Sequence, residues 1–513
     1  MGGPIDEQTR TGASRPRADQ THDHTDQGGK PMRPAYLGLD LGTSSLKALI
    51  VDDAGTVLAR AEAGYVTTVT EPGAAEQHPA DWANALDRLL AAFPAEARAR
   101  VTAVGLAGHV PTLVLVDAAG VPVRPAMTWQ DSRATAQAKA LEEALGDVAA
   151  LVGTPLPWSP AQLPAKLRWV ADRDPAAAAA ARWILQPKDY LAWLLTGEFR
   201  TDGWSSKGVA DVRSGAPITR ILEATGFSAE HCPAATKPWE PAGQLTESAA
   251  SRFGLPVGTP VATGWSDALA AVLAVGGFDR PSAFILGGTS DIVGVSAASV
   301  AEVEGVYSVP AAAAPLALSF GPTQGSGASL DWICGVLRLD RREALEAAAG
   351  ASATGLPMFL PYLSGERAPV WNPAVRGMFL GLDSRHGSGE LVRAVLRGVA
   401  LSGRHVLERA ATSTESGSTE IHVGGRGTDS ALWQSTRLRA LGKRLVVHAE
   451  PSLSALGAAM LGAMAVGVPL SGLGALRGET QTIEPGRDEL TAAENEYSDY
   501  LAASAMAIEW SKR

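Results

Sequence analysis

The sequence predicts an α/β protein built from two related lobes that face each other across a hinge. Apolar strands alternate with alanine-rich helical stretches along the chain, which is typical of this class. A strand, a Gly-Thr-Ser turn and a second strand occur near residue 40 and again near residue 287, which indicates an internal duplication. With 513 residues, the chain is also longer than one domain usually is.

The individual elements follow from hydrophobic spacing and turn residues. Helical spacing is expected from Pro79 onward and in the stretches 133–151 and 175–195. Extended segments are expected at 36–40, 46–51, 56–61, 101–107, 113–116, 282–286, 292–296 and 420–423, and a helix is expected to start near Ala431.

Composition excludes several classes of partner. Lys and Arg number 44 against 54 Asp and Glu, a net charge of −10, and they are dispersed, so we expect no nucleic-acid partner. No apolar run reaches the roughly 18–20 residues that span a bilayer, and the N-terminus lacks the apolar core of a signal peptide, so we expect no membrane partner. The two cysteines, Cys232 and Cys334, give neither a disulfide framework nor metal-ligand spacing, so we expect a reducing, cytoplasmic location.

The two Gly-Thr-Ser turns are candidates for phosphate binding. Glycine lets backbone N–H groups approach a phosphate, and the adjacent hydroxyls add donors. We therefore expect phosphate contacts at Gly42, Thr43 and Ser44 in the first turn and at Gly288 and Thr289 in the second. Asp40 precedes the first turn, where its carboxylate could reach a phosphate-bound Mg²⁺; the alternative is a turn cap.

Asp267 is the candidate catalytic base. It follows Gly264-Trp265-Ser266 and precedes a helix of small residues at 268–276. An Asp at this position caps the helix by default. Phosphoryl transfer, however, needs a carboxylate that accepts the proton of the attacking hydroxyl, and Asp267 lies at the predicted junction of the lobes.

A third glycine-rich turn follows the strand at 420–423 and precedes the helix near Ala431. Gly424, Gly425 and Asp429 belong to this turn, which suits close packing against a nucleotide. An ordinary tight turn is the alternative.

Candidate substrate contacts lie in two short segments. Trp129, Asp131 and Arg133 combine an aromatic face with a carboxylate and a guanidinium, a set that can stack on a sugar and bind its hydroxyls. A surface salt bridge beside a core Trp is the alternative. His109, with Val110 after it, is a second candidate, although an isolated histidine is often structural.

Taken together, these motifs resemble the FGGY family of carbohydrate kinases, from about residue 36 to about residue 470. The landmarks occur in the family's order, at residues 40–43, 129–133, 187–191, 195–197, 264–267, 288–290, 327–332, 361–367, 424–425 and 455–459. The resemblance implies two actin-like, ribonuclease-H-like lobes that close on ATP and sugar. It also implies a base at Asp267, a metal-site carboxylate at Asp40, and nucleotide contacts at Gly288, Thr289, Gly327 and Gly425.

The polar composition of residues 1–33, with only scattered apolar residues, predicts a disordered leader. With the resemblance, the expected organisation continues with the sugar-binding lobe at 34–262, the nucleotide-binding lobe at 263–480 and a C-terminal helical extension at 481–513. Homodimers are common in the family, so a homodimer is one expected state.

Within the family, the segments 187–201 and 361–367 are most similar to those of xylulose kinases. The implied activity is ATP-dependent phosphorylation of D-xylulose to D-xylulose 5-phosphate. Two usual sugar contacts are missing, because residues 109–112 read His-Val-Pro-Thr instead of Gln-Met-His-Gly, and Ala268 replaces an Asn. The alternatives are another ketose or polyol, such as ribulose or erythritol, and an actin-like ATP-binding module without sugar chemistry.

Overall fold

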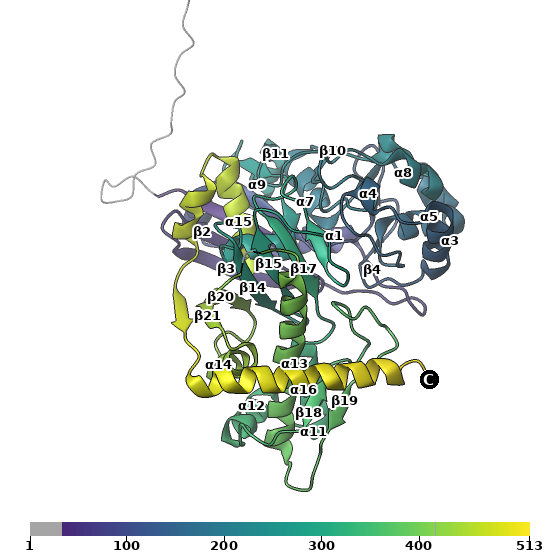
Figure 1. The fold of residues 1–513 in the computed structure, drawn as a ribbon. Helices are drawn as coiled ribbons and strands as arrows, with labels where there is room; N and C mark the ends of the chain where they lie inside the picture. The colour runs from purple at the N-terminus through teal and green to yellow at the C-terminus, as the bar shows by residue number, and fades with distance from the viewer. Residues whose placement is uncertain (1–32, 416) are drawn as a thin grey trace, which may run out of the picture. The chain divides into compact units, whose positions relative to one another are not determined.

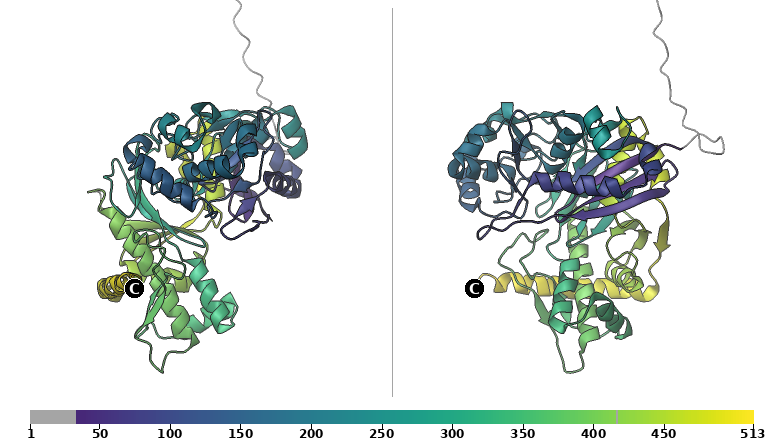
Figure 2. Two further views of the ribbon diagram at one scale, coloured as in Figure 1. Left: turned by 90° about the vertical axis from the view of Figure 1, so that its right-hand side faces the viewer. Right: turned by 180° about the vertical axis from the view of Figure 1, so that it is seen from behind.

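Two mixed β-sheets carry the two Gly-Thr-Ser turns (Figures 1 and 2). The computed structural model describes residues 33–415 and 417–513, so the leader expected at 1–33 lies almost entirely outside the described residues. The α/β class expected from the sequence is confirmed by the alternation of strands and helices in both halves.

The first sheet has the order β11-β12-β5-β1-β2-β3, with β13 also paired to β5. Strands β1, β2 and β3 form an antiparallel meander, and β5 lies parallel to β1 on its other side. The strands are β1 (Ala35–Leu41), β2 (Ser45–Asp52), β3 (Val57–Gly64), β5 (Val101–Gly108), β11 (Pro241–Gln244), β12 (Pro260–Ala262) and β13 (Trp265–Ser266). The turn between β1 and β2 is the first Gly-Thr-Ser turn.

The second sheet repeats this plan in the order β16-β17-β15-β14-β20-β21-β22. Strands β14, β15 and β17 form the antiparallel part, and β20 lies parallel to β14. The strands are β14 (Ser282–Gly287), β15 (Ile292–Ala297), β16 (Tyr307–Val309), β17 (Ala317–Pro322), β20 (Glu420–Gly425), β21 (Arg444–His448) and β22 (Thr480–Ile483). The repeated strand directions agree with the internal duplication inferred from the two turns.

Two helices of small residues, α10 (Asp267–Ala274) and α15 (Leu453–Ala465), pack closely on each other and on the first sheet. A Cβ atom on Gly105 of β5 would lie 1.7 Å from the Ala458 carbonyl oxygen, and one on Gly457 would lie 1.8 Å from that of Ala270. Only glycine allows these approaches, since Cβ contacts in proteins are much longer. Both helices also contribute to a core cluster that includes buried residues of both sheets.

The other face of the first sheet is covered by α1 (Pro79–Ala92), α7 (Pro187–Thr196) and α9 (Glu247–Phe253). On the second sheet, α13 (Ser388–Ala411) packs on β15 and β17, and α16 (Arg487–Trp510) crosses α13 and packs on α14 (Ala431–Leu441) (Figure 1). The remaining helices are α2 (Ala95–Ala99), α3 (Thr135–Leu145), α4 (Ala149–Val152), α5 (Leu163–Arg173), α6 (Pro175–Ala180), α8 (Thr219–Thr225), η1 (Ala229–His231), α11 (Gly327–Leu337), α12 (Arg341–Gly350) and η2 (Leu470–Leu476).

Short strand pairs complete the fold. They join β4 (Glu76–Gln77) to β7 (Ala126–Met127), β6 (Val114–Val116) to β8 (Trp183–Leu185), β9 (Arg200–Thr201) to β10 (Ala234–Ala235), and β18 (Met358–Leu360) to β19 (Met378–Leu380). The single helix expected over 175–195 is therefore wrong in its centre, because β8 separates α6 from α7. The alanine run favoured a helix, but residues 183–185 gain a strand partner in β6, and Pro187 starts a new helix.

The expected lobe boundaries at 262/263 and 480/481 stay predictions. Helix α15 belongs to the second half of the sequence yet packs against β1 and β5 of the first sheet. Residues 481–513 contain the end of β22 followed by α16, which agrees with a largely helical C-terminal segment.

Candidate active site

A single cavity of about 1220 Å³ is lined by both Gly-Thr-Ser turns. Gly42, Thr43 and Ser44 line it from the β1–β2 turn, and Gly288 and Thr289 line it from the β14–β15 turn. The two turns thus open onto one space, as the predicted duplication requires. A cavity of this volume has room for a nucleotide and a small second substrate.

Asp40 is the second-last residue of β1, lines this cavity and is buried. Its Oδ1 atom has no hydrogen-bond partner among the described residues. Burial and, to a smaller extent, the negative charge of Asp267 raise the pKa of Asp40, and Lys47, its neighbour across the strand pair, opposes the rise; together these effects bring the pKa to about 7. A buried, unpartnered carboxylate oxygen is costly unless a cation or donor reaches it, so Asp40 is suited to holding a metal ion.

Asp267 begins α10 and also lines the cavity. The residue that caps this helix is Ser266, whose Oγ accepts a hydrogen bond from the Leu269 N–H at 3.4 Å. The Asp267 carboxylate accepts one hydrogen bond, from the Ala268 N–H at 2.7 Å, and burial raises its pKa to about 6. A carboxylate with this pKa is ionised at neutral pH and is still a competent proton acceptor.

The second turn is held by residues behind it. The Gly327 N–H donates to the Gly288 carbonyl at 3.2 Å, and a Cβ on Gly327 would lie 2.6 Å from that oxygen. Arg367 donates to the Ser290 hydroxyl at 3.0 Å and to the Thr323 carbonyl at 2.5 Å, and it lines the cavity. Gly327 itself is not among the lining residues, so its hydrogen bond supports the turn from behind.

The third glycine-rich turn reaches the cavity only in part. Gly425 lines it with a backbone φ of +91°, a conformation that favours glycine, and the next residue, Arg426, donates its N–H to the Gly287 carbonyl at 3.1 Å. Gly424 and Asp429 are not among the lining residues. Their proposed nucleotide contacts stay predictions.

His109, Val110 and Trp129 line the cavity on the side of the first half of the chain. The Trp129 indole N–H donates to the Thr43 hydroxyl at 2.9 Å, which joins this wall to the first turn. His109 Nδ1 lies 2.8 Å from the Thr112 hydroxyl, and its Nε2 has no partner among the described residues. Burial lowers the pKa of His109 to about 3, so its imidazole is neutral at pH 7.

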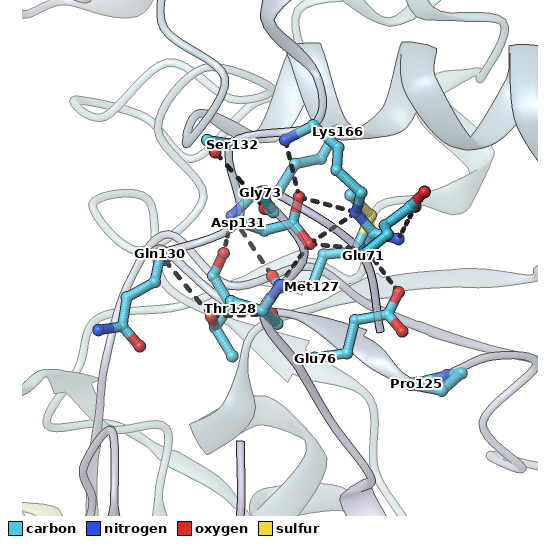
Figure 3. Close-up of polar contacts among 12 residues, drawn as sticks. Glu71, Gly73, Glu76, Pro125, Met127, Thr128, Gln130, Asp131, Ser132 and Lys166 are labelled. Atoms are coloured by element: carbon cyan, nitrogen blue, oxygen red, sulfur yellow. Dashed lines mark hydrogen bonds and ion pairs between the residues drawn. The ribbon is translucent and has the colours of Figure 1, made fainter. Parts of the chain in front are cut away.

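Asp131 and Arg133 do not line the cavity. The Asp131 carboxylate accepts the Ala75 N–H at 3.0 Å and pairs with Arg133 at 2.6 Å, and Arg133 also pairs with Glu76 at 2.6 Å (Figure 3). The Arg133 guanidinium lies 4.5 Å from the Trp169 ring centroid. This network agrees with the salt-bridge alternative, although the salt bridge is buried; a sugar contact by either residue stays an untested prediction.

Lys166 connects the two loops of this wall. Its ammonium donates to the carbonyl of Pro111 at 2.9 Å. It also donates to the carbonyls of Thr128 at 2.7 Å and Met127 at 3.3 Å, two residues labelled with it in Figure 3. The side chain is fully buried, and burial lowers its pKa to about 7. The residues that carry His109 and Trp129 are thereby fixed relative to each other.

The comparison with protein families decides the identity of the fold. The N-terminal domain of the FGGY family of carbohydrate kinases matches residues 35–274, and the C-terminal domain of the same family matches residues 283–466. The chain belongs to the FGGY family of carbohydrate kinases. It is a sugar kinase, which confirms the family inferred from the motifs; the alternative of an actin-like module without sugar chemistry is not supported.

Relatives of this FGGY kinase include enzymes with two different names. The xylulose kinase of Escherichia coli (strain K12) is 32% identical over 441 residues, which cover 84% of this chain and 90% of that protein. The gluconokinase of Bacillus subtilis (strain 168) is 25% identical and covers 85% and 88% of the two chains. The crystal structure of xylulose kinase from Rhodospirillum rubrum superimposes with a TM-score of 0.82 at 26% identity, covering 93% of this chain and all of that one. The expected two-domain, actin-like fold is confirmed.

Among the described residues, four basic side chains of this FGGY kinase line the cavity but were not predicted as site residues: Lys47, Lys207, Arg367 and Arg426. Lys47 left a weak signal in the sequence, since it is the one charged residue in the apolar run 46–51. Lys207 left none, because it lies in a loop without periodicity. Arg367 belonged to a family landmark, but its contact with the second turn required the structure.

The donor set around Asp40 fits a hard cation that takes most of its ligands from a substrate. No group of three or more His, Cys, Asp or Glu side chains that could hold a metal ion occurs in residues 33–415 and 417–513. Magnesium in nucleotide sites typically uses one or two carboxylates together with phosphate oxygens and water. The unpartnered Oδ1 of Asp40 beside the first turn matches that pattern.

None of the helices in residues 33–415 and 417–513 is long and apolar enough to cross a membrane.

Proposed function

We propose that this kinase transfers the γ-phosphoryl group of ATP to the terminal hydroxyl of a small open-chain sugar, with D-xylulose as the first acceptor to test. The observation that carries the proposal is the Asp267 carboxylate, which lines the same cavity as both Gly-Thr-Ser turns. A base beside two phosphate-sized turns is the arrangement that phosphoryl transfer to an alcohol requires.

In this mechanism, backbone N–H groups and hydroxyls of the two turns bind the phosphates. Arg367, which is already hydrogen-bonded to Ser290, adds positive charge at the second turn. Asp40 would hold Mg²⁺ together with phosphate oxygens, and the ion, when bound, neutralises part of the phosphate charge. Asp267 orients the acceptor hydroxyl and takes its proton as the new bond to phosphorus forms.

The acceptor lies against the wall formed by His109, Val110 and Trp129. The Trp129 ring offers an apolar face to sugar C–H groups, and the free Nε2 of neutral His109 can bind a hydroxyl. D-xylulose is favoured because the relatives with about 30% identity are named xylulose kinases. Val110 and Ala268 cannot make polar side-chain contacts, so another ketose or polyol is the alternative acceptor.

The test is an ADP-release assay with ATP, Mg²⁺ and one acceptor at a time. The panel contains D-xylulose, L-xylulose, D-ribulose, D-fructose, erythritol, gluconate and glycerol. We expect acceptor-dependent ADP formation with the highest kcat/KM for a pentulose. If no acceptor raises ADP formation above the rate with water alone, the proposed function is wrong; if only a non-pentulose does so, the reaction stands and D-xylulose is replaced.

A further inference from the structure

Lys207 is a buried lysine whose ammonium faces the cavity without a partner. The residue is only 6% exposed and lines the cavity together with Asp267. Within residues 33–415 and 417–513, its Nζ atom forms neither an ion pair nor a hydrogen bond, and its contact is the Trp204 ring, whose centroid lies 4.9 Å away. The nearby carboxylates of Asp202 and Asp267 act on it only at longer range.

The position of Lys207 is built into the loop that carries it. The Asp202 carboxylate accepts the Ser205 N–H at 3.0 Å and pairs with the fully buried Lys188 at 2.9 Å. The Thr201 and Ser206 hydroxyls are 2.9 Å apart. Because these contacts hold the segment that leads to Lys207, and Lys207 itself is buried, its ammonium is positioned by the fold and is not a mobile surface charge.

The other basic side chains of the cavity lie beside the glycine-rich turns. Of the four basic side chains that line the cavity within the described chain, Arg367 bonds Ser290 of the second turn, and Lys47 lies opposite Asp40 beside the first. Arg426 follows Gly425 and is exposed. Lys207 is the buried residue among the four. Lys207 and Lys47 both interact electrostatically with Asp267, but only Lys207 lies away from the two turns.

A buried ammonium without a partner is costly, and the cost is recovered when a ligand supplies an anion. Two groups in the proposed reaction could do so: the phosphoryl group in transit, or a carboxylate on an acidic acceptor. The phosphoryl group must pass beside Asp267 for every acceptor. A carboxylate of an open-chain acid would instead lie at the end of the chain opposite the reacting hydroxyl, away from Asp267.

We propose that Lys207 is a catalytic residue that binds a non-bridging oxygen of the phosphoryl group while it moves from ATP to the acceptor. This inference rests on the proposed function of the same cavity. In the step, the bond between the acceptor oxygen and the γ-phosphorus forms, and the bond from that phosphorus to the β–γ bridging oxygen breaks. The bonding electron pair leaves with ADP, and the acceptor proton goes to Asp267. Lys207 donates hydrogen bonds and transfers no proton.

The test compares Lys207→Met, which keeps length and removes charge, with Lys207→Arg, which keeps charge. We expect Lys207→Met to lower kcat by about 10²–10³-fold for every acceptor that is turned over, with the KM for ATP changed less than about threefold. Lys207→Arg should recover at least part of kcat. Burial lowers the pKa of Lys207 to about 8, so wild-type kcat/KM should fall above that pH, and the arginine variant should lose this basic limb.

A binding measurement keeps the proposal testable without turnover. The planar complex of ADP with aluminium fluoride imitates a phosphoryl group in transit, and calorimetry gives its affinity. We expect Lys207→Met to weaken this complex at least about tenfold while ADP alone binds as before. Equal affinity in both proteins overturns the proposal. So does a loss of kcat confined to acidic acceptors, which would assign Lys207 to an acceptor carboxylate. Absence of any acceptor-dependent ADP formation by the wild type instead refutes the proposed function.

Discussion

Replacing Asp267 by Asn removes the proposed base with almost no change in shape. The asparagine oxygen can still accept the Ala268 N–H, and Ser266 still caps α10, so the helix should persist. The variant cannot accept the acceptor proton. Loss of a positioned general base usually costs about 10²–10⁴-fold, and we expect kcat to fall within that range while ATP affinity stays within about threefold.

The pH dependence of kcat/KM in the wild type gives a second quantitative prediction for Asp267. Burial raises the pKa of Asp267 to about 6. The ionised fraction, and with it kcat/KM, should therefore drop from roughly nine tenths at pH 7 to roughly one tenth at pH 5. In the Asn variant, the residual rate should lack this acidic limb.

Stability should change in the opposite direction from activity. Because the pKa of Asp267 is higher in the folded chain than the ordinary 3.8, its ionised form destabilises the fold. This cost is absent below pH 3.8, grows between pH 3.8 and 6, and is complete above pH 6. A rise to about 6 corresponds to about 3 kcal/mol, and exposure of the carboxylate to the cavity reduces this to about 1–2 kcal/mol. The Asn variant should thus unfold at a higher temperature at pH 8 but not at pH 4.

The assays are coupled ADP release for activity, calorimetry for ATP binding, and thermal unfolding at several pH values. The matched control is Asp331→Asn, which removes an exposed carboxylate paired with Arg341 and not found among the cavity-lining residues. The reasoning is refuted if Asp267→Asn keeps more than a tenth of wild-type kcat. A lower melting temperature of the variant at pH 8 would show that the carboxylate stabilises the fold, contrary to the expectation from its raised pKa.

Three further predictions concern the metal site, the contact between α10 and α15, and the ion pair of Asp131 with Arg133. Asp40→Asn should raise the Mg²⁺ concentration for half-maximal activity by about tenfold or more, measured by metal titration; an unchanged requirement would remove Asp40 from the metal site. Gly457→Ala should lower the free energy of unfolding by about 1–3 kcal/mol in denaturant titrations, because its Cβ would meet the Ala270 carbonyl oxygen at 1.8 Å, whereas Gly335→Ala, with nothing within 4 Å, should not. Arg133→Met leaves the buried Asp131 carboxylate without its cation and should cost about 3–5 kcal/mol of stability. A change confined to the acceptor KM of the Arg133 variant would instead support the sugar contact predicted from the sequence.

The sequence by itself determined the features that are local along the chain. The strand that leads through Asp40 into a Gly-Thr-Ser turn could be predicted from the sequence, because turn residues and strand periodicity act over a few positions. The recurrence of the pattern at residues 282–290 indicated the duplication, and the ordered series of motifs identified the family. The local sequence alone would have assigned Asp267 as a helix cap; its role as a base was inferred from its place at the predicted junction of the lobes and from the family resemblance.

Tertiary structure decided which side chains share a space. Asp131 and Arg133 lie two and four residues from Trp129, yet only Trp129 lines the cavity, because the other two turn toward Ala75 and Glu76. Residues 183–185 became a strand because β6, about 70 residues earlier, offered a partner. Lys207 lines the cavity because its loop is held by the buried Lys188, in helix α7, through Asp202. Such placements depend on contacts between distant segments, and these leave no pattern in the adjacent sequence.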